Sequence, residues 1–192
     1  MRIHTFLLSL ILIFISANII AQDTINGADI VKVNDIAFIK GNSEPFTGIS
    51  AYRFPDGRPQ VVTTYVKGLP NGIETNWFGN GNKFMEITFV NGDFEGSFKQ
   101  WFENGRLEAE KVYSGGMMNG PAVHYYENGN IESRGSYHDC HENGFWEYWF
   151  ESGVKMAEGS YDDGEKSGIW KSWDEAGNPL PDEEFRSSKA IE

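Results

Sequence analysis

The sequence predicts an all-β protein, an elongated and twisted antiparallel meander of six tandem 24-residue β-hairpin repeats behind a short N-terminal capping strand. Three registers of the same period carry this prediction, because self-similarity at a fixed spacing is typical of repeat architectures. A glycine recurs every 24 residues, a second glycine follows each one nine residues later, and an aromatic residue keeps the same period. The leading glycines are Gly48, Gly72, Gly96, Gly120, Gly144 and Gly168; the second glycines are Gly57, Gly81, Gly105, Gly129, Gly153 and Gly177; the aromatics are Tyr65, Phe89, Tyr113, Tyr137 and Tyr161.

Each repeat reads as two strands joined by a tight turn. The first strand follows the leading glycine, for example over residues 73–78, 97–102 and 145–150. A turn such as Asn104-Gly105 comes next, and these residue types tolerate the positive φ that tight hairpins require. The second strand then runs to the recurring aromatic, as over 107–113, and a connector leads into the next unit. The connector carries a glycine at Gly68, Gly92, Gly116 and Gly164, and Cys140 in the same register.

The flanking segments differ from the repeats. Residues 1–21 read as a signal peptide, with Arg2 before an apolar stretch and a cut near Ala21, although an uncleaved N-terminal anchor is the alternative. Residues 22–45 form a leader, whose segment 30–39 is rich in strand-forming residues and either caps the edge of the first hairpin or is only partly ordered. The repeat domain spans 46–178, and we expect the tail 179–192 to be disordered.

The formal charge of −12 disfavours binding to negatively charged partners. Nucleic acids demand a positive surface, so DNA or RNA binding is disfavoured, and direct binding to anionic lipid is disfavoured for the same reason. An acidic surface is compatible with basic partners and with a periplasmic or secreted location. The single cysteine, Cys140, excludes an intramolecular disulfide, so packing and the sheet ladder must stabilise the fold.

Two adjacent aromatics occupy the end of the first strand in most units. Neighbours on a strand point to opposite faces, so each face of the sheet is expected to carry an aromatic ladder. One ladder would be buried, and the other could contact a partner or be structural as well. The candidate partner-binding residues are Trp77, Trp101, Tyr125, Trp149 and Trp173; the opposite ladder is Phe78, Phe102, Tyr126 and Phe150.

The repeat resembles the bacterial MORN-variant repeat, found in the group often labelled YwqK-family antitoxins. The likeness lies in the pattern Gly96, Trp101-Phe102, Gly105, Tyr113 and Gly116, and it covers about residues 46–178. The resemblance implies an array of antiparallel hairpins that serves as an interaction scaffold, and it brings no catalytic residues. A signal peptide conflicts with a cytoplasmic antitoxin that neutralises a neighbouring toxin.

Other candidate sites have simpler interpretations. His138, Cys140 and His141 are potential zinc ligands, but they lack a recognisable zinc spacing, and a polar connector with a free or chain-linking thiol is the alternative. Acidic turns such as Glu103, Glu127 and Glu151 could attract a basic partner or calcium, or simply form a solvated rim. No motif of known catalytic context is present, so we predict a protein that is not an enzyme and has no cofactor.

These observations predict an exported scaffold that binds a protein through an aromatic sheet face. A module that binds glycans of the cell envelope is the first alternative, because aromatic rows can stack on sugar rings. An antitoxin-like protein that neutralises a toxin is the second. The sequence does not define the oligomeric state.

Overall fold

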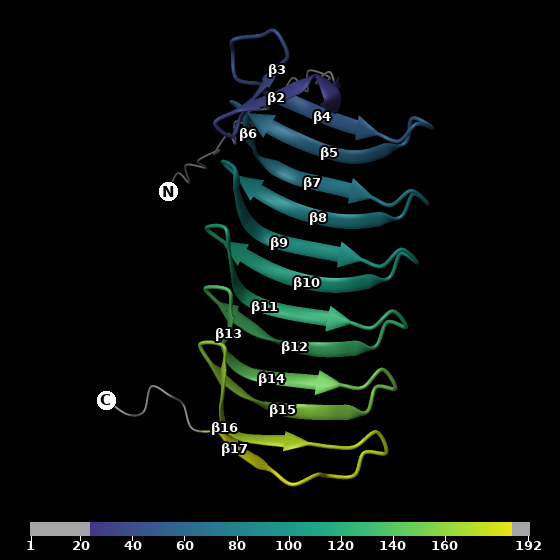
Figure 1. Ribbon diagram of the computed structural model, residues 1–192, viewed down its shortest axis with the longest axis vertical. Helices are drawn as coiled ribbons and strands as arrows, with labels where there is room; N and C mark the ends of the chain where they lie inside the picture. The colour runs from purple at the N-terminus through teal and green to yellow at the C-terminus, as the bar shows by residue number, and fades with distance from the viewer. Residues whose placement is uncertain (1–23, 186–192) are drawn as a thin grey trace, which may run out of the picture.

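The computed structural model describes residues 24–185 and shows an all-β chain with one short 3-10 helix and no α-helix in that range (Figure 1). The predicted antiparallel meander is confirmed, because the long strands from β4 onward pair in chain order, β1-β4-β5-β7-β8-β9-β10-β11-β12-β14-β15-β16-β17, while the short β6 and β13 pair only with β5 and β12. The elements are β1 Thr24–Asn26, η1 Gly27–Asp29, β2 Ile30–Val33, β3 Ile36–Ile39, β4 Gly48–Arg53, β5 Pro59–Val66, β6 Leu69–Pro70, β7 Gly72–Trp77, β8 Lys83–Val90, β9 Asp93–Trp101, β10 Leu107–Ser114, β11 Met117–Tyr125, β12 Ile131–His138, β13 His141–Glu142, β14 Gly144–Trp149, β15 Lys155–Asp162, β16 Glu165–Ser172 and β17 Glu183–Phe185.

The six units are the hairpins β4–β5, β7–β8, β9–β10, β11–β12, β14–β15 and β16–β17, stacked along the long axis of the molecule (Figure 1). The turns within the hairpins all lie at one end of the strands, and the connectors between hairpins lie at the other end (Figure 1). Each connector is itself a two-residue turn with positive φ at both positions, for example 51° at Asn91 and 95° at Gly92. This geometry matches the twist of the flanking strands, which explains the recurring glycine.

The leading glycines have a different role from the turn glycines. Gly96 has φ +84° and lies where the pairing of β9 with β8 shifts register, between Ile87 and Phe89. A bulge of this kind accepts glycine because positive φ costs it little. The 24-residue period therefore records three kinds of bend in each unit: a hairpin turn, a connector turn and a bulge.

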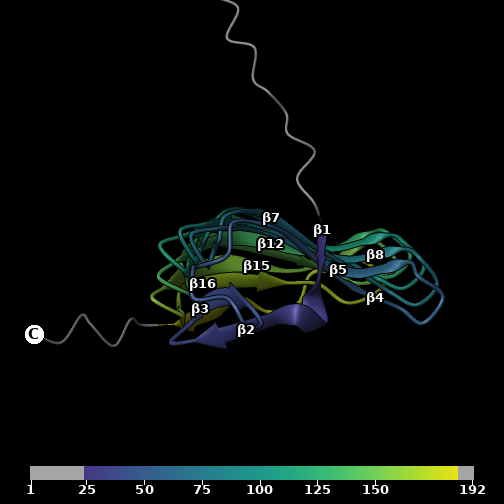
Figure 2. The same ribbon diagram turned by 90° about the horizontal axis from the view of Figure 1, so that it is seen from above.

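The two faces of the sheet differ in character. The face that carries the recurring aromatics, here called the inner face, includes the row Tyr65, Phe89, Tyr113, Tyr137 and Tyr161. Figure 2 shows that the hairpin β2–β3 lies on the hollow side of the arched sheet. The opposite face, here called the tryptophan face, carries Trp77, Trp101, Tyr125 and Trp149, which share the outward parity of their strands, and Trp173, which directly follows β16.

The N-terminal segment covers the first unit in two ways. Strand β1 pairs in parallel with β4 and forms the edge of the sheet. The segment 30–39, expected as a possible edge cap, instead folds into the hairpin β2–β3 and packs on the inner face. Ala37 and Phe46 bury Tyr65 there, and Tyr65 is only 6% exposed. The edge is capped by residues 24–26, because the apolar side chains of the hairpin are better buried against an aromatic sheet face.

The tail differs from the sequence prediction. The sequence predicts that residues 179–185 are disordered, but the structure describes them, and Glu183–Phe185 forms strand β17, which pairs with β16. Phe185 lies 24 residues after Tyr161, pairs with Gly168 as Tyr161 pairs with Gly144, and packs edge-on against Trp170 with ring centroids 6.4 Å apart. The sixth repeat therefore ends on the same aromatic register as the others.

The predicted signal peptide, residues 1–21, and the end of the tail, 186–192, lie outside the described residues. Between Thr24 and Phe185, no helix has the length and apolar character needed to cross a bilayer.

Candidate partner-binding faces

The five predicted contact residues lie in a row on the tryptophan face, and all of them are half-buried. Their neighbours on this face are charged, and the charges are paired: Lys83 with Glu86 at 2.5 Å, Lys99 with Glu110 at 3.0 Å, and Lys155 with both Glu147 and Glu158 at 2.6 Å. The two carboxylates around Lys155 and the guanidinium of Arg134 make this region a small ion-pair network.

The cations of this network also cover the indole rings. The Arg134 guanidinium carbon lies 5.1 Å from the centre of the Trp149 ring, and the Lys155 ammonium lies 5.5 Å from it. Lys83 lies in the same way 5.4 Å from Trp101. Such contacts are attractive because the ring face is electron-rich. Trp101 and Trp149 therefore have partners within their own chain, and an external partner at these two rings would have to compete with those cations.

Hydrogen bonds favour the ionised form of the Glu147 carboxylate in this network. The pKa of Glu147 is lowered, chiefly by its hydrogen bond from Arg134 and also by the hydrogen bond from Lys155, against the opposing effect of burial. Desolvation disfavours the charge of Lys155, but its hydrogen bonds to Glu147 and Glu158 together outweigh this effect and raise its pKa. These shifts describe a structural ion-pair network rather than a reactive group.

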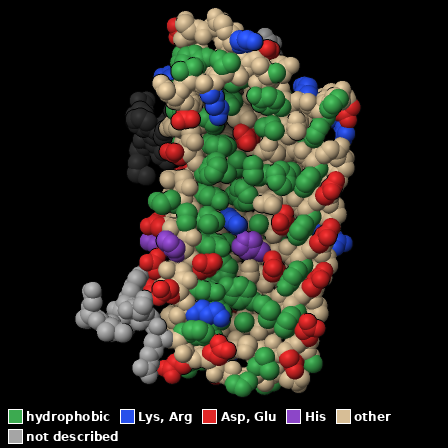
Figure 3. Space-filling view, in the orientation of Figure 1, with side chains coloured by type: hydrophobic (Ala, Val, Ile, Leu, Met, Phe, Trp, Pro, Cys, Tyr) green, Lys and Arg blue, Asp and Glu red, His purple; other side chains and the backbone are tan. Residues whose placement is uncertain are grey.

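The inner face carries two clusters of packed aromatic rings. Near the middle of the chain, Phe94 lies 4.9 Å from Phe89 and 5.5 Å from Tyr113, both measured between ring centroids. Farther along, Trp146 packs edge-on against Tyr137 at 5.2 Å, and a similar contact joins Tyr161 to Trp170 at 5.0 Å. Burial raises the pKa of Tyr137 to about 12. Figure 3 shows hydrophobic side chains that form a band along this face of the sheet.

Two glycines make room for the largest rings of the band. Trp146 is 2% exposed and lies over Gly135, while Trp170 lies over Gly159. A Cβ atom at either glycine would lie within 3.0 Å of three atoms of the facing indole. Each indole nitrogen donates to a backbone carbonyl of the same neighbouring strand: Trp146 to Ser136 at 3.1 Å and Trp170 to Ser160 at 3.0 Å.

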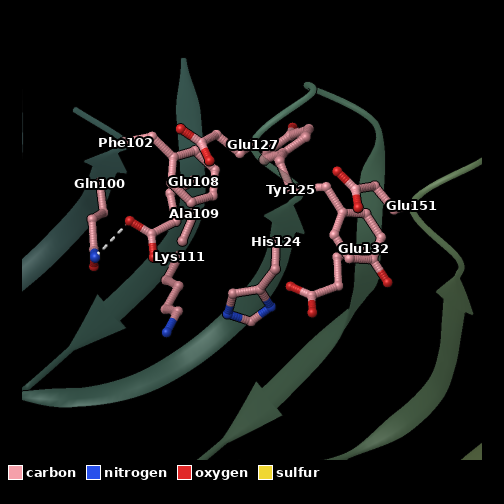
Figure 4. A pocket seen from close by; sticks show the side chains of 11 residues that line it. Gln100, Phe102, Glu108, Ala109, Lys111, His124, Tyr125, Glu127, Glu132 and Glu151 are labelled. Atoms are coloured by element: carbon pink, nitrogen blue, oxygen red, sulfur yellow. Dashed lines mark hydrogen bonds between the residues drawn. The ribbon is translucent and has the colours of Figure 1, made fainter. Parts of the chain in front are cut away.

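A hollow of about 410 Å³ interrupts the band between the two aromatic clusters (Figure 4). Phe102 and Tyr126, members of the second predicted ladder, lie beside it. The other lining residues are polar or small: Gln100, Glu108, Ala109, Lys111, His124, Glu127, Glu132 and Glu151, together with Tyr125.

His124 and Ser133 meet at the inner face, with His124 Nδ1 and Ser133 Oγ 3.1 Å apart. Burial lowers the pKa of His124, and the charge of Lys111 lowers it further. A histidine–serine contact can activate a nucleophile, but Ser133 is 6% exposed and lies on β12 directly opposite His124, next to a shift of strand register. The contact therefore satisfies a buried hydroxyl and favours neutral imidazole.

The candidate metal ligands do not converge. His138 faces Asp139 of its own connector at 3.9 Å, and His141 faces Asp163 of the next connector at 3.2 Å. The thiol of Cys140 accepts a hydrogen bond from the Met118 amide at 3.3 Å. Within residues 24–185 no group of three or more His, Cys, Asp or Glu residues is arranged to hold a metal ion.

Asparagine side chains form hydrogen bonds between successive hairpin turns, and the amino-acid composition does not predict these bonds. The Asn80 and Asn82 amides donate to the carbonyl of Glu103 in the next turn, at 2.7 and 2.9 Å. Asn128 and Asn130 repeat this arrangement on Glu151, at 2.8 and 2.9 Å. These asparagines thus tie the second unit to the third and the fourth to the fifth, in addition to adopting the turn conformation.

Comparisons with known proteins find a known repeat family in two of the units. The family described as MORN repeat variant matches residues 94–114 and 118–139, which are the third and fourth units and carry most of the residues around the hollow. No curated protein matches the chain. A solved structure, the Glycosylation Associate Protein (Gap123) complex from Streptococcus agalactiae, is similar at 16% identity and a TM-score of 0.32; the match covers 54% of this chain and 19% of that chain.

Proposed function

We propose that this chain is an exported, non-enzymatic scaffold that binds a partner protein on its inner face. Repeats of the MORN type commonly mediate interactions with proteins or membranes, which supports a binding role. Export is the expectation from residues 1–21 and forms part of the proposal.

The observation that carries the proposal is the unequal burial of equivalent aromatics. Tyr65 is 6% exposed because Phe46 and the hairpin β2–β3 cover it, with ring centroids of Phe46 and Tyr65 5.7 Å apart. Phe89, Tyr113 and Tyr137 occupy the same register in later units and are only half-buried. The chain therefore shows, at its first unit, how an apolar segment packs on this face, and it leaves the following units open to a segment from another protein.

The inner face supports this role better than the tryptophan face. Trp101, Trp149 and Trp173 lie beneath Lys83, Arg134 and Lys155, so a partner on this part of the tryptophan face would have to displace those cations. On the inner face, Phe84 is 39% exposed and Phe94 is 36% exposed, and no cation of residues 24–185 lies over either ring. Aromatic side chains of this kind are common anchors at protein interfaces.

Site-specific photo-cross-linking tests the proposal. The photoreactive residue p-benzoylphenylalanine replaces Phe84 or Phe94 on the inner face, or Phe145, which is 55% exposed on the tryptophan face, as the matched control. We expect irradiation of cells that produce these variants to give a covalent protein adduct from Phe84 and Phe94 but not from Phe145. Adducts from Phe145 alone would place the contact on the tryptophan face. Protease-resistant carbohydrate adducts would instead identify a glycan-binding module.

A further inference from the structure

The central hollow of the inner face arises from substitutions within the repeat register. Phe84 in the second unit and Met156 in the fifth stand where the third and fourth units carry Glu108 and Glu132. Likewise, Met85 of the second unit corresponds to Ala109 of the third. Two central units therefore replace large apolar side chains with small or acidic ones, and the aromatic band opens into the hollow at that point.

The acids of the hollow differ from those of the tryptophan face. Four glutamates of the tryptophan face, Glu86, Glu110, Glu147 and Glu158, have cationic partners within 4 Å. In that same range, no lysine or arginine lies within 4 Å of the carboxylates around the hollow, which are Glu108, Glu127, Glu132 and Glu151. Glu108 accepts a hydrogen bond from Gln100 at 2.8 Å. Only one cation, Lys111, is among the residues that line the hollow.

We propose that the inner face from β8 to β12 docks a basic segment of the partner protein, and that the hollow receives an arginine side chain of that segment. The proposal rests on the proposed function, and it names the chemistry of the partner. The same face already binds an apolar segment of its own chain at the first unit, so the docking surface is continuous with an interface that the fold itself uses.

The charge and shape of the hollow select a guanidinium group. Its carboxylates outnumber its single ammonium group, so it offers a net negative field to a cation. Arginine forms bidentate hydrogen bonds with carboxylates, and its planar group stacks on aromatic rings such as those of Phe102 and Tyr126. Figure 4 shows Phe102 and the carboxylates of Glu108, Glu127, Glu132 and Glu151 around one opening. Phe84 and Phe94 then provide apolar contacts for the flanking residues of the segment.

Nuclear magnetic resonance titration of the whole protein tests the hollow directly. The probe is acetyl-arginine amide, the neutral comparison is acetyl-citrulline amide, and the signals are those of the His124 ring and the Ala109 methyl group, which line the hollow. We expect the arginine probe to shift both signals saturably and the citrulline probe to leave them unchanged. Equal shifts with the two probes, or shifts confined to the tryptophan indoles, would overturn the proposal.

A charge-matched pair of variants isolates the acids of the hollow. The double variant Glu108→Gln/Glu132→Gln removes two carboxylates from the hollow, and Glu103→Gln/Glu175→Gln removes two from turns outside it. We expect the first to weaken binding of the arginine probe at least tenfold and the second to change it less than twofold. Equal weakening by both would reduce the effect to net charge and reject the site.

The two proposals fail separately. Protein adducts from Phe84 and Phe94 without any response to the arginine probe would reject the arginine site and leave the scaffold role intact. A response to the probe without protein adducts would reject the scaffold role and leave a cation-binding hollow.

Discussion

Replacement of Gly135 by alanine tests how the inner face is packed. The backbone of Gly135 has no positive φ, so the new methyl group meets only packing constraints. Its Cβ would lie within 3.0 Å of three atoms of the Trp146 indole, and Trp146 is 2% exposed, so the ring must shift. Overpacking of a close-packed site costs about 1–3 kcal/mol. Complete loss of the packing of a large aromatic ring, about 3–5 kcal/mol, sets the upper limit.

Gly79→Ala is the matched control for this substitution. Gly79 also lacks positive φ, and a Cβ there would meet no atom within 4 Å. We expect Gly79→Ala to change the free energy of unfolding by less than about 0.5 kcal/mol, as substitutions on open surface do. Urea unfolding followed by tryptophan fluorescence and far-UV circular dichroism measures both variants.

A double-mutant cycle shows whether the cost arises from Trp146. When Trp146→Ala has already removed the ring, Gly135→Ala should cost almost nothing, which gives a coupling energy of about 1–3 kcal/mol. The reasoning is refuted if Gly135→Ala costs the same with and without Trp146, or if it costs no more than Gly79→Ala. In either case the glycine would serve the backbone rather than the indole.

Further predictions concern the connector, the histidine and the tryptophan face. Cys140 has φ +69° at a connector position where the other units hold glycine. Cys140→Gly should therefore raise the free energy of unfolding, measured by urea denaturation, by about 0.5–1 kcal/mol. A decrease would show that the hydrogen bond from the Met118 amide to the thiol outweighs the backbone strain. The pKa of His124 is lower in the folded state than in the unfolded chain. The unfolded chain therefore binds more protons as the pH falls below about 6.5, and the stability of the fold declines there. Thermal unfolding between pH 5 and 8 should show this decline in the native chain and a smaller decline in His124→Gln. Trp149→Ala should destabilise the fold by about 1–3 kcal/mol, because the ring packs beneath Arg134 and Lys155; unchanged stability would mean that the ring is available to a partner instead.

The period of the glycines was sufficient to predict the fold. Turns and bulges that need positive φ restrict the residue type locally, so residues such as Gly92 and Gly96 reveal their roles without knowledge of tertiary contacts. The register also contained the last strand, since Phe185 follows Tyr161 by 24 residues, but the irregular segment between them obscured it.

The character of each face could not be predicted, because it depends on contacts between units. The cations that cover Trp149 come from Arg134 and Lys155 on neighbouring strands, and no spacing rule places them over the ring. The hollow depends on a further detail. A register shift between Leu107 and Ala109 allows Glu108 to reach Gln100 on the inner face, whereas strict alternation would send it to the other side.

The position of the hairpin β2–β3 was hidden for a similar reason. Its alternating apolar residues predict strands, but they fit an edge position and a packed position equally well. The choice depends on Phe46 and Tyr65, which form a buried cluster with Ala37 only once the chain has folded.

The short strands β1 and β17 have a consequence for assembly. A sheet of near-identical hairpins presents, at each end, the same hydrogen-bonding groups that join its units, and such an end can recruit another molecule into a fibril. Here the first end is occupied by three residues running parallel to their neighbour, and the last by three residues that end on Phe185. Removal of either strand would expose a longer template, so truncation at these ends is expected to convert a discrete particle into a polymerising one.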